Sequence, residues 1–489
     1  MALLSDITLY RPTKATTTAS FYFHLCLKSF YCGGVVLEKS EYTVTPMMAQ
    51  FSEIKKEYPL ALLFYRMGDF YELFFDDAVL AAQALDIALT KRGKHLGEDI
   101  PMCGVPVHAS EGYLLRLIRK GFRVAVCEQL EDPKEAKKRG SKSVVKRGVV
   151  RLVTPGTLTE DSLLNPRKSN FLAAFSNVRD KSCLAWVDIS TGIVCYRSCL
   201  PTQLGPELAR LAPAEILVSE DADVNIYEII FDSGTASTKM PPTFFDSEAG
   251  LKNLIEAYGD EKVSVFSELD RSDTAALGVL IEYLSTTQKE QTPLLQLPIC
   301  EAQGDFVSID AATRRNLELT ETLNGNHQGS LLFAVDRTVT GAGARLLYHR
   351  ITTPSQRIDL ISERANAVQF FCEDSGTRTA IRIALKQLPD IERALSRLAL
   401  GRGGPRDLVA IANGTMQAIK VSQLLSEKSL PSLLNSRNPD LVGHDLLSNK
   451  LTTALIPNPP ILIRDGGFID TGYSNDLDEV RALRDEARL

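Results

Sequence analysis

Hydrophobic and polar positions alternate between two patterns along the first part of the chain. Residues 49–58 have the polar, amphipathic pattern that predicts a helix, and residues 60–65 form a short apolar run that predicts a buried strand. From 70 to 89 apolar residues recur at three and four positions, which predicts a helix packed on a sheet. A further helix is expected over 110–120 and a further strand over 122–127. Helices that alternate with strands are typical of a compact α/β domain.

The pattern changes again beyond this domain. Short apolar runs separated by one helical segment, at 203–211, predict a second α/β domain between about 170 and 235. After about 245 the strand-like runs fade and long amphipathic segments follow, which predicts an all-α region. The predicted strands are 170–175, 183–189, 192–197 and 215–218, and the predicted helices are 247–258, 272–288, 311–323, 341–351, 357–371, 390–400 and 406–425. The fold class is therefore multidomain α/β plus all-α.

These changes of pattern set the expected domain boundaries. Residues 1–44 have no clear period and are expected to be an N-terminal extension with no place in the domains. The chain stops inside a helical pattern without a C-terminal glycine or polar tail, so we expect a fragment of a longer protein. The expected units are 1–44, 45–155, 156–295, 296–480 and 481–489.

Charge is distributed unevenly over these units. The 489 residues include 55 basic and 61 acidic side chains, a net charge of −6. Residues 45–155 carry 18 basic and 14 acidic side chains, and a basic linker runs from 134 to 151. The asymmetry predicts an anionic partner for the first domain, although a solvated charged surface has the same composition.

Cysteine and hydropathy patterns narrow the class of protein. Nine cysteines contain no C-x-x-C pair, which argues against a disulfide framework or a closed zinc site and favours the cytoplasm. No stretch reaches the ~18 apolar residues that a membrane span requires.

The most informative segment is Arg66-Met-Gly-Asp-Phe-Tyr-Glu-Leu-Phe74. One interpretation is structural, with Asp69 as the N-cap of a helix and Glu72 as the capping-box acid. The other is functional, because an aromatic side chain such as Phe70, exposed beside duplex DNA, can wedge into a base step from the minor groove. A carboxylate such as Glu72 can accept a hydrogen bond from a displaced base. Local physics leaves both interpretations open.

This segment closely resembles the mismatch-recognition motif of the MutS family of bacterial DNA mismatch repair proteins. Six further matches follow in the same order, and together they cover the chain from about residue 45 to its end. The matching segments are 63–74, 89–93, 100–108, 126–129, 153–157, 309–318 and 464–468. The sequence departs from the family pattern at Cys103 and Val107. We expect this departure to affect the packing around these two residues more than the aromatic wedge, Phe70.

The resemblance implies a mismatch-recognition domain, an RNase H-like connector and a core of lever helices, with the clamp beginning at 481. It implies that Phe70 stacks on the mispaired base, that Glu72 hydrogen-bonds it, and that Arg92 contacts the minor groove or a phosphate. The implied partners are mismatched double-stranded DNA, a second copy of the full-length protein in a homodimer, and a MutL-type repair protein. The resemblance implies no membrane partner and a cytoplasmic, nucleoid-associated location.

Two enzymatic alternatives remain to be weighed. Asp188 lies within a predicted strand, as in RNase H-type nucleases, but two-metal hydrolysis needs several convergent carboxylates and no second or third acid is evident, so we interpret Asp188 as structural. Full-length members of the family are ATPases, which requires G-x-x-x-x-G-K-[ST]. The sequence contains no such P-loop: the glycine clusters at 341–345 and 401–405 lack the Lys-Ser/Thr pair. We therefore expect no enzyme activity and no cofactor in this chain, with ATP and Mg²⁺ bound only by a missing ATPase domain.

Overall fold

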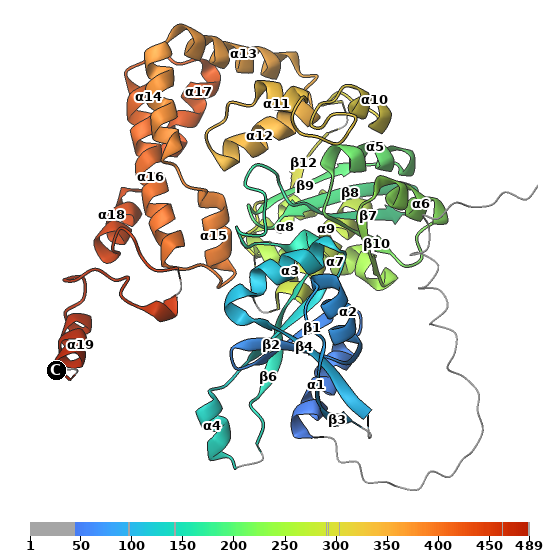
Figure 1. The fold of residues 1–489 in the computed structure, drawn as a ribbon. Coiled ribbons are helices and arrows are strands. Elements are labelled where there is room, and N and C mark those ends of the chain that lie inside the picture. Colours follow the sequence, from blue (N-terminus) through green and yellow to red (C-terminus); the bar gives the residue numbers. More distant parts are fainter. Residues whose placement is uncertain are drawn as a thin grey trace, which may run out of the picture. The chain divides into compact units, whose positions relative to one another are not determined.

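The computed structural model describes residues 45–487 apart from 96–97, 141–142, 290, 292, 303 and 462. The expected extension at 1–44 lies outside the described residues, as do the last two residues of the expected clamp segment. Two mixed sheets and a helical region make up the described part (Figure 1). The coarse fold class, α/β domains followed by helices, is thus confirmed. Within these residues, no helix is long and apolar enough to cross a membrane.

The first sheet has six strands in the order β3-β4-β2-β1-β5-β6. Strand β1 runs parallel to β5, and the other neighbours are antiparallel. Helix α1 covers one face of the sheet, and α2 and α3 cover the other. The central strands are apolar on both faces because both faces are covered. The bounds are β1 (Leu62–Met67), β2 (Phe70–Phe74), β3 (Thr90–His95), β4 (Glu98–Pro106), β5 (Val124–Gln129), β6 (Arg147–Val153), α1 (Pro46–Glu57), α2 (Phe75–Leu85), α3 (Ser110–Arg119) and α4 (Pro133–Lys138).

The helix expected over 70–89 is wrong in its first part. The segment begins as strand β2, and the helix α2 starts only at Phe75. Gly68 has φ +61° and forms a two-residue turn with Asp69, so that Met67 pairs with Phe70 in a hairpin. A glycine with positive φ at the first turn position is typical of type II′ hairpins. The apolar spacing of three and four residues that suggested a helix arises because this short strand runs directly into α2.

The second sheet has the order β11-β10-β7-β8-β9-β12. Strands β7, β8 and β9 form an antiparallel meander, and β10 and β11 continue from β7 in parallel. Helices α5 and α6 pack on one face and α7 and α9 on the other. The bounds are β7 (Leu172–Val178), β8 (Lys181–Asp188), β9 (Ile193–Ser198), β10 (Glu215–Ser219), β11 (Ala236–Met240), β12 (Ile299–Cys300), α5 (Pro201–Leu211), α6 (Val224–Ser233), α7 (Ser247–Tyr258), α8 (Val263–Phe266) and α9 (Arg271–Gln288).

The remainder is helical, as the amphipathic pattern predicts. The helix expected over 311–323 is shorter than predicted and ends at Asn316, because Glu318 turns the chain with φ +47°. The longest helix, α16, packs against α14, α15 and α18. The bounds are α10 (Ala311–Asn316), α11 (Leu331–Val335), α12 (Gly341–Thr352), α13 (Ile358–Glu373), α14 (Ser375–Lys386), α15 (Ile391–Ala399), α16 (Pro405–Ser426), α17 (Ser432–Arg437), α18 (Asp445–Ala454) and α19 (Asn475–Glu486).

Candidate nucleic-acid interface

The hairpin of β1 and β2 presents an exposed aromatic side chain at its turn. Phe70 is 47% exposed and pairs with Met67 on one side and Pro106 on the other. The next side chains along the strand alternate: Tyr71 and Leu73 are buried in the core beneath α2 and α3. Because successive side chains of a strand point to opposite faces, Phe70 and Glu72 share the other face. Phe70 is therefore held by a paired backbone while its ring stays accessible.

The helix-cap interpretation of this segment is contradicted by the structure. Asp69 lies in the hairpin turn, and Glu72 lies in the middle of a strand, paired with Tyr65 and Gly104. The following helix has Phe74 as its N-cap, and no side chain caps it. A capping box needs the cap residue and the acid in one helical turn, which β2 does not provide. Neither Asp69 nor Glu72 is placed here to start a helix.

Glu72 and Arg92 are brought together by strand pairing, although they lie twenty residues apart in the sequence. The guanidinium of Arg92 donates to both carboxylate oxygens of Glu72. Arg92 stands in the edge strand β3, where an irregularity in the pairing with β4 occurs and Gly93 has φ +68°. Arg92 therefore belongs to a basic edge strand, for which β4 supplies the backbone partners. The Arg92 side chain is 41% exposed and that of Glu72 is 13% exposed, so the pair borders solvent.

Two residues that the sequence analysis did not assign to the site support it. A Cβ on Gly104 would lie 3.8 Å from both the Glu72 Cγ and the Phe70 ring, so its backbone passes directly beneath them. Arg147 was counted only as part of the basic linker, but it is buried and its guanidinium lies 4.9 Å from the centre of the Tyr65 ring. Its Nε donates to the Arg66 carbonyl oxygen at 2.7 Å, which ties β6 to the hairpin. No local sequence signal marks either role, since both depend on strand order.

The other face of the hairpin is fixed by a partly buried polar contact. The Tyr71 hydroxyl donates to the Glu128 carboxylate, and the Arg66 guanidinium lies 3.5 Å from the same carboxylate. Burial, with the neighbouring Glu128, raises the pKa of Tyr71 well above its ordinary value. Tyr71 therefore remains a neutral hydrogen-bond donor, and β2 is held to β5 across β1.

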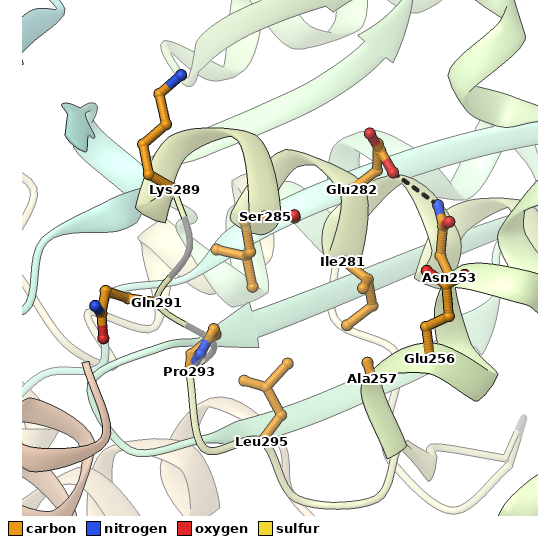
Figure 2. A pocket seen from close by; sticks show the side chains of 11 residues that line it. Asn253, Glu256, Ala257, Ile281, Glu282, Ser285, Lys289, Gln291, Pro293 and Leu295 are labelled. Atoms are coloured by element: carbon orange, nitrogen blue, oxygen red, sulfur yellow. Dashed lines mark hydrogen bonds between the residues drawn. The ribbon is translucent and has the colours of Figure 1, made fainter. Parts of the chain in front are cut away.

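A small cavity of about 240 Å³ lies in the second α/β domain, between α7 and the end of α9 (Figure 2). Its wall combines apolar side chains with a hydrogen bond of 3.1 Å from Asn253 Nδ2 to Glu282 Oε2. None of the residues predicted for DNA contact lines it. The lining residues include Glu256, Ile281, Ser285, Lys289 and Leu295.

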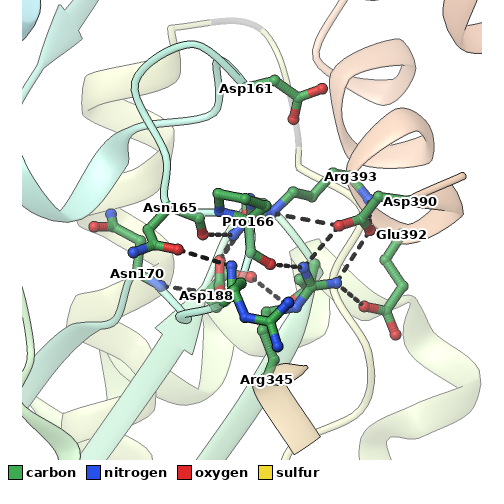
Figure 3. Close-up of polar contacts among 12 residues, drawn as sticks. Asp161, Asn165, Pro166, Asn170, Asp188, Arg345, Asp390, Glu392 and Arg393 are labelled. Carbon is green, nitrogen blue, oxygen red and sulfur yellow. Dashed lines mark hydrogen bonds and ion pairs between the residues drawn. The ribbon is translucent and has the colours of Figure 1, made fainter. Parts of the chain in front are cut away.

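Asp188 lies at the end of β8 and is completely buried (Figure 3). Its carboxylate accepts hydrogen bonds from the backbone and hydroxyl of Ser190, at 3.0 and 2.6 Å, and from the backbone of Asn170 at 3.2 Å. Burial raises the pKa of Asp188. Across the described residues, no cluster of three acidic, histidine or cysteine side chains could hold a metal ion. The contacts fit a carboxylate that closes the turn after a strand.

The chain matches family models over nearly all its described length. MutS domain I matches residues 45–162, MutS domain II matches 170–296, and MutS domain III matches 312–488. The chain belongs to the MutS family. The resemblance carried by the seven sequence segments is therefore confirmed.

Relatives within the MutS family share more than half of their aligned residues with this chain. The DNA mismatch repair protein MutS of Dinoroseobacter shibae is 56% identical over 449 residues, which are 92% of this chain and 51% of that protein. The proteins of the same name from Paracoccus denitrificans and Ruegeria pomeroyi are 56% and 57% identical over 91% of this chain. The chain spans about half the length of the relatives it matches.

The MutS domain boundaries place the candidate residues. Phe70, Glu72 and Arg92 all belong to domain I, on strands β2 and β3 of one sheet, with β4 between the two strands. Asp188 belongs to MutS domain II, on a different sheet. Domain I thus brings together an exposed aromatic side chain, a carboxylate and a partly exposed guanidinium.

Proposed function

We propose that this chain recognises mispaired or looped duplex DNA through the hairpin of β1 and β2. The observation that carries the proposal is the half-exposed Phe70, fixed at a rigid hairpin turn beside Glu72. Its MutS relatives are named DNA mismatch repair proteins, which agrees with this role. In the proposal, Phe70 enters the minor groove and stacks on the mispaired base.

The selectivity of such a wedge comes from the DNA as well as the protein. A mispaired step stacks less well and bends more easily, so that unstacking and kinking it costs less free energy than for a matched step. One aromatic ring can therefore favour many different mismatches. The hydrogen bond from a displaced base to Glu72 would add a contact that matched DNA, with its bases inside the helix, does not offer.

In this mechanism, Glu72 and Arg92 exchange their contact with each other for contacts with DNA. Exposed ion pairs contribute only about 0–1 kcal/mol, so the pair can open without a large loss of stability. In the proposal, Glu72 turns to the base while the Arg92 guanidinium moves to a phosphate or a groove edge. Before DNA binds, the two opposite charges neutralise each other, so the pair does not repel the phosphates.

The wider assignments are also proposals. The meander β7-β8-β9 with β10 and β11 in parallel fits an RNase H-like connector, and the long helices fit a core of lever helices. We infer the unit boundaries at 155, 295 and 480 and the start of a clamp at 481. The full-length protein would form a homodimer, meet a MutL-type partner at the nucleoid in the cytoplasm, and use ATP and Mg²⁺ in a further domain. This chain, which lacks a P-loop, would bind mismatched DNA but would not hydrolyse ATP.

The glutamate's role leads to a first expected result. Glu72→Gln should lower the ratio of mismatched to matched affinity, mainly by strengthening binding to matched DNA, because the Arg92 guanidinium, no longer neutralised by Glu72, would attract the phosphates of any duplex. Thermal unfolding should change little, since Gln has nearly the shape of Glu and the lost ion pair borders solvent, where such pairs contribute about 0–1 kcal/mol. Competition binding with the two duplexes measures the ratio, and Glu98→Gln, an exposed acid on β4 of the same sheet, is the control. An unchanged ratio would remove Glu72 from the recognition site.

Salt provides a second expected result. Phosphate contacts release counterions, so affinity for any duplex should fall linearly with salt on a double logarithmic plot, by about 0.9 per phosphate neutralised. We expect at least a tenfold loss between 50 and 200 mM salt, which corresponds to about two contacts or more. Affinity that does not depend on salt would contradict an interface built on the basic first domain.

The proposed function itself is tested by equilibrium competition. The purified chain is bound to a fluorescent duplex with one G·T mispair or one unpaired nucleotide and competed with the matched duplex of otherwise identical sequence. We expect preference for both defects over the matched duplex. Equal affinity for all three duplexes would refute mismatch recognition by this chain.

A further inference from the structure

A basic projection emerges from the same end of the first sheet as Phe70. Residues 130–146, between β5 and β6, contain six basic and three acidic side chains. Figure 1 shows α4 standing off from the sheet within this projection. We name the described residues of this segment, 130–140 and 143–146, the basic arm. The proposed wedge does not use it.

The position of the basic arm follows from the strand directions. Strand β1 runs parallel to β5, with Leu62 opposite Val124 and Tyr65 opposite Cys127. The carboxyl ends of these neighbouring strands therefore lie at one end of the sheet. The hairpin turn before Phe70 follows β1, and the basic arm follows β5.

Side-chain contacts connect the base of the basic arm to the hairpin. The Arg66 guanidinium lies 3.5 Å from the Glu128 carboxylate at the end of β5. On the returning strand, Arg147 donates through Nε to the Arg66 carbonyl oxygen at 2.7 Å and lies 3.3 Å from the Met67 sulfur. Contacts on both strands that carry the arm therefore fix its base relative to the Phe70 turn.

The basic arm has internal hydrogen bonds that fix its backbone. The Asp132 carboxylate accepts a hydrogen bond of 2.7 Å from the Lys134 backbone and starts α4. The Glu131 carboxylate accepts hydrogen bonds from the Arg139 side chain and from the Lys146 backbone, so its negative charge is paired within the arm. The Ala136 side chain on α4 is only 2% exposed. The arm is thus a folded support and not only a run of charged residues.

Three lysines on α4 remain available to a partner. Lys134, Lys137 and Lys138 are exposed and lie three and four positions apart, which places them on one side of the helix. Among the described residues, no carboxylate lies within ion-pair distance of any of these three ammonium groups. Flexible lysines with free ammonium groups contact phosphates as point charges and read no base sequence.

We propose that the basic arm binds the phosphate backbone of duplex DNA beside the step that Phe70 enters. This inference rests on the proposed function, to which it adds a second, sequence-independent contact surface. The arm supplies affinity for any duplex, whereas the hairpin supplies the preference for a mispair. Because the arm and the hairpin are joined through Arg66 and Arg147, the arm also fixes the distance along the DNA between the two contacts.

The test is a triple substitution, Lys134→Gln, Lys137→Gln and Lys138→Gln. Affinity should fall about tenfold or more for matched and mismatched duplexes alike, and the salt slope should fall by about 2–3, since each phosphate contact accounts for about 0.9. The ratio of the two affinities should stay constant. The matched control is Lys252→Gln, Lys386→Gln and Lys420→Gln, three exposed lysines outside the first domain that give the same change of net charge.

A second triple substitution, Lys134→Arg, Lys137→Arg and Lys138→Arg, keeps the three positive charges. Its affinity and salt slope should match those of the unsubstituted chain. Equal affinity of the arm and control variants would overturn the proposal, and so would a loss confined to mismatched DNA. Failure of the proposed function gives a different result: the unsubstituted chain would then bind both duplexes equally, whatever the arm variants do. Absence of any duplex binding would contradict both.

Discussion

Phe70→Ala is expected to remove most of the preference for mismatched DNA while leaving the fold intact. The ring is 47% exposed, so its loss should cost far less than the ~3–5 kcal/mol of a buried Phe→Ala change. Loss of stacking on a base costs about 1–3 kcal/mol, so affinity for a mismatched duplex should fall roughly 5- to 150-fold. Affinity for matched DNA, which the ring does not enter, should change little.

Competition binding and thermal unfolding of the same preparation measure both parts of this result. Phe231→Ala is the control, because Phe231 on α6 is 84% exposed and belongs to the other sheet. It should leave both the affinity ratio and the unfolding midpoint unchanged. A Phe70→Ala variant that unfolds, or that keeps its full preference, would show that the ring has a structural role only.

Gly278→Ala is expected to destabilise the second α/β domain strongly. Helices α7 and α9 approach so closely that a Cβ on Gly278 would lie 2.3 Å from the Gly250 Cα. A substitution on the facing helix meets the same obstacle, since a Cβ on Gly250 would lie 2.5 Å from the Thr274 carbonyl oxygen. Both obstacles are backbone atoms, so no side chain can move aside, and α9 is buried along most of its length. Overpacking of this kind costs about 1–3 kcal/mol, and we expect a value at or above the upper end.

Thermal unfolding followed by calorimetry measures this effect as a lowered midpoint of one transition. Gly112→Ala on α3 is the matched control, because nothing lies within 4 Å of the Cβ that it would add. Alanine in place of an exposed helical glycine should stabilise by about 0.5–1 kcal/mol. If Gly278→Ala leaves the midpoint unchanged, the close approach of α7 and α9 is wrong.

Hydrophobic periodicity is sufficient for the succession of α/β regions followed by helices and for the elements whose burial is regular. The helix at 110–120 and the strand near 122–127 follow from it, since α3 and β5 each bury a regular set of apolar side chains. The β2 strand could not be separated from α2 in this way, because five residues that run directly into a helix show too little of the period of two. Pairing with β4 decides their conformation, and the partner residues lie 28 to 36 positions away in the sequence.

The candidate site shows the same limit. The residue types at Phe70, Glu72 and Arg92 could be selected from the sequence, with the family resemblance. The contact between Glu72 and Arg92 could not, because it depends on the order β3-β4-β2. The burial of Arg147 could not be predicted either. A basic residue within a charged run is expected to be exposed, but the pairing of β6 with β5 buries Arg147 against Tyr65.

The most direct test of the central claim is a photo-crosslink from the mispaired base. 5-Iodo-2′-deoxyuridine placed opposite guanine in the duplex reacts on irradiation with an aromatic side chain that stacks on it, and mass spectrometry of the digested complex identifies the residue. We predict a crosslink to Phe70 with the mispaired duplex, and little or none when the same base is placed opposite adenine. A crosslink to another residue, or equal yield at Phe70 from both duplexes, would contradict recognition of the mispair by this ring.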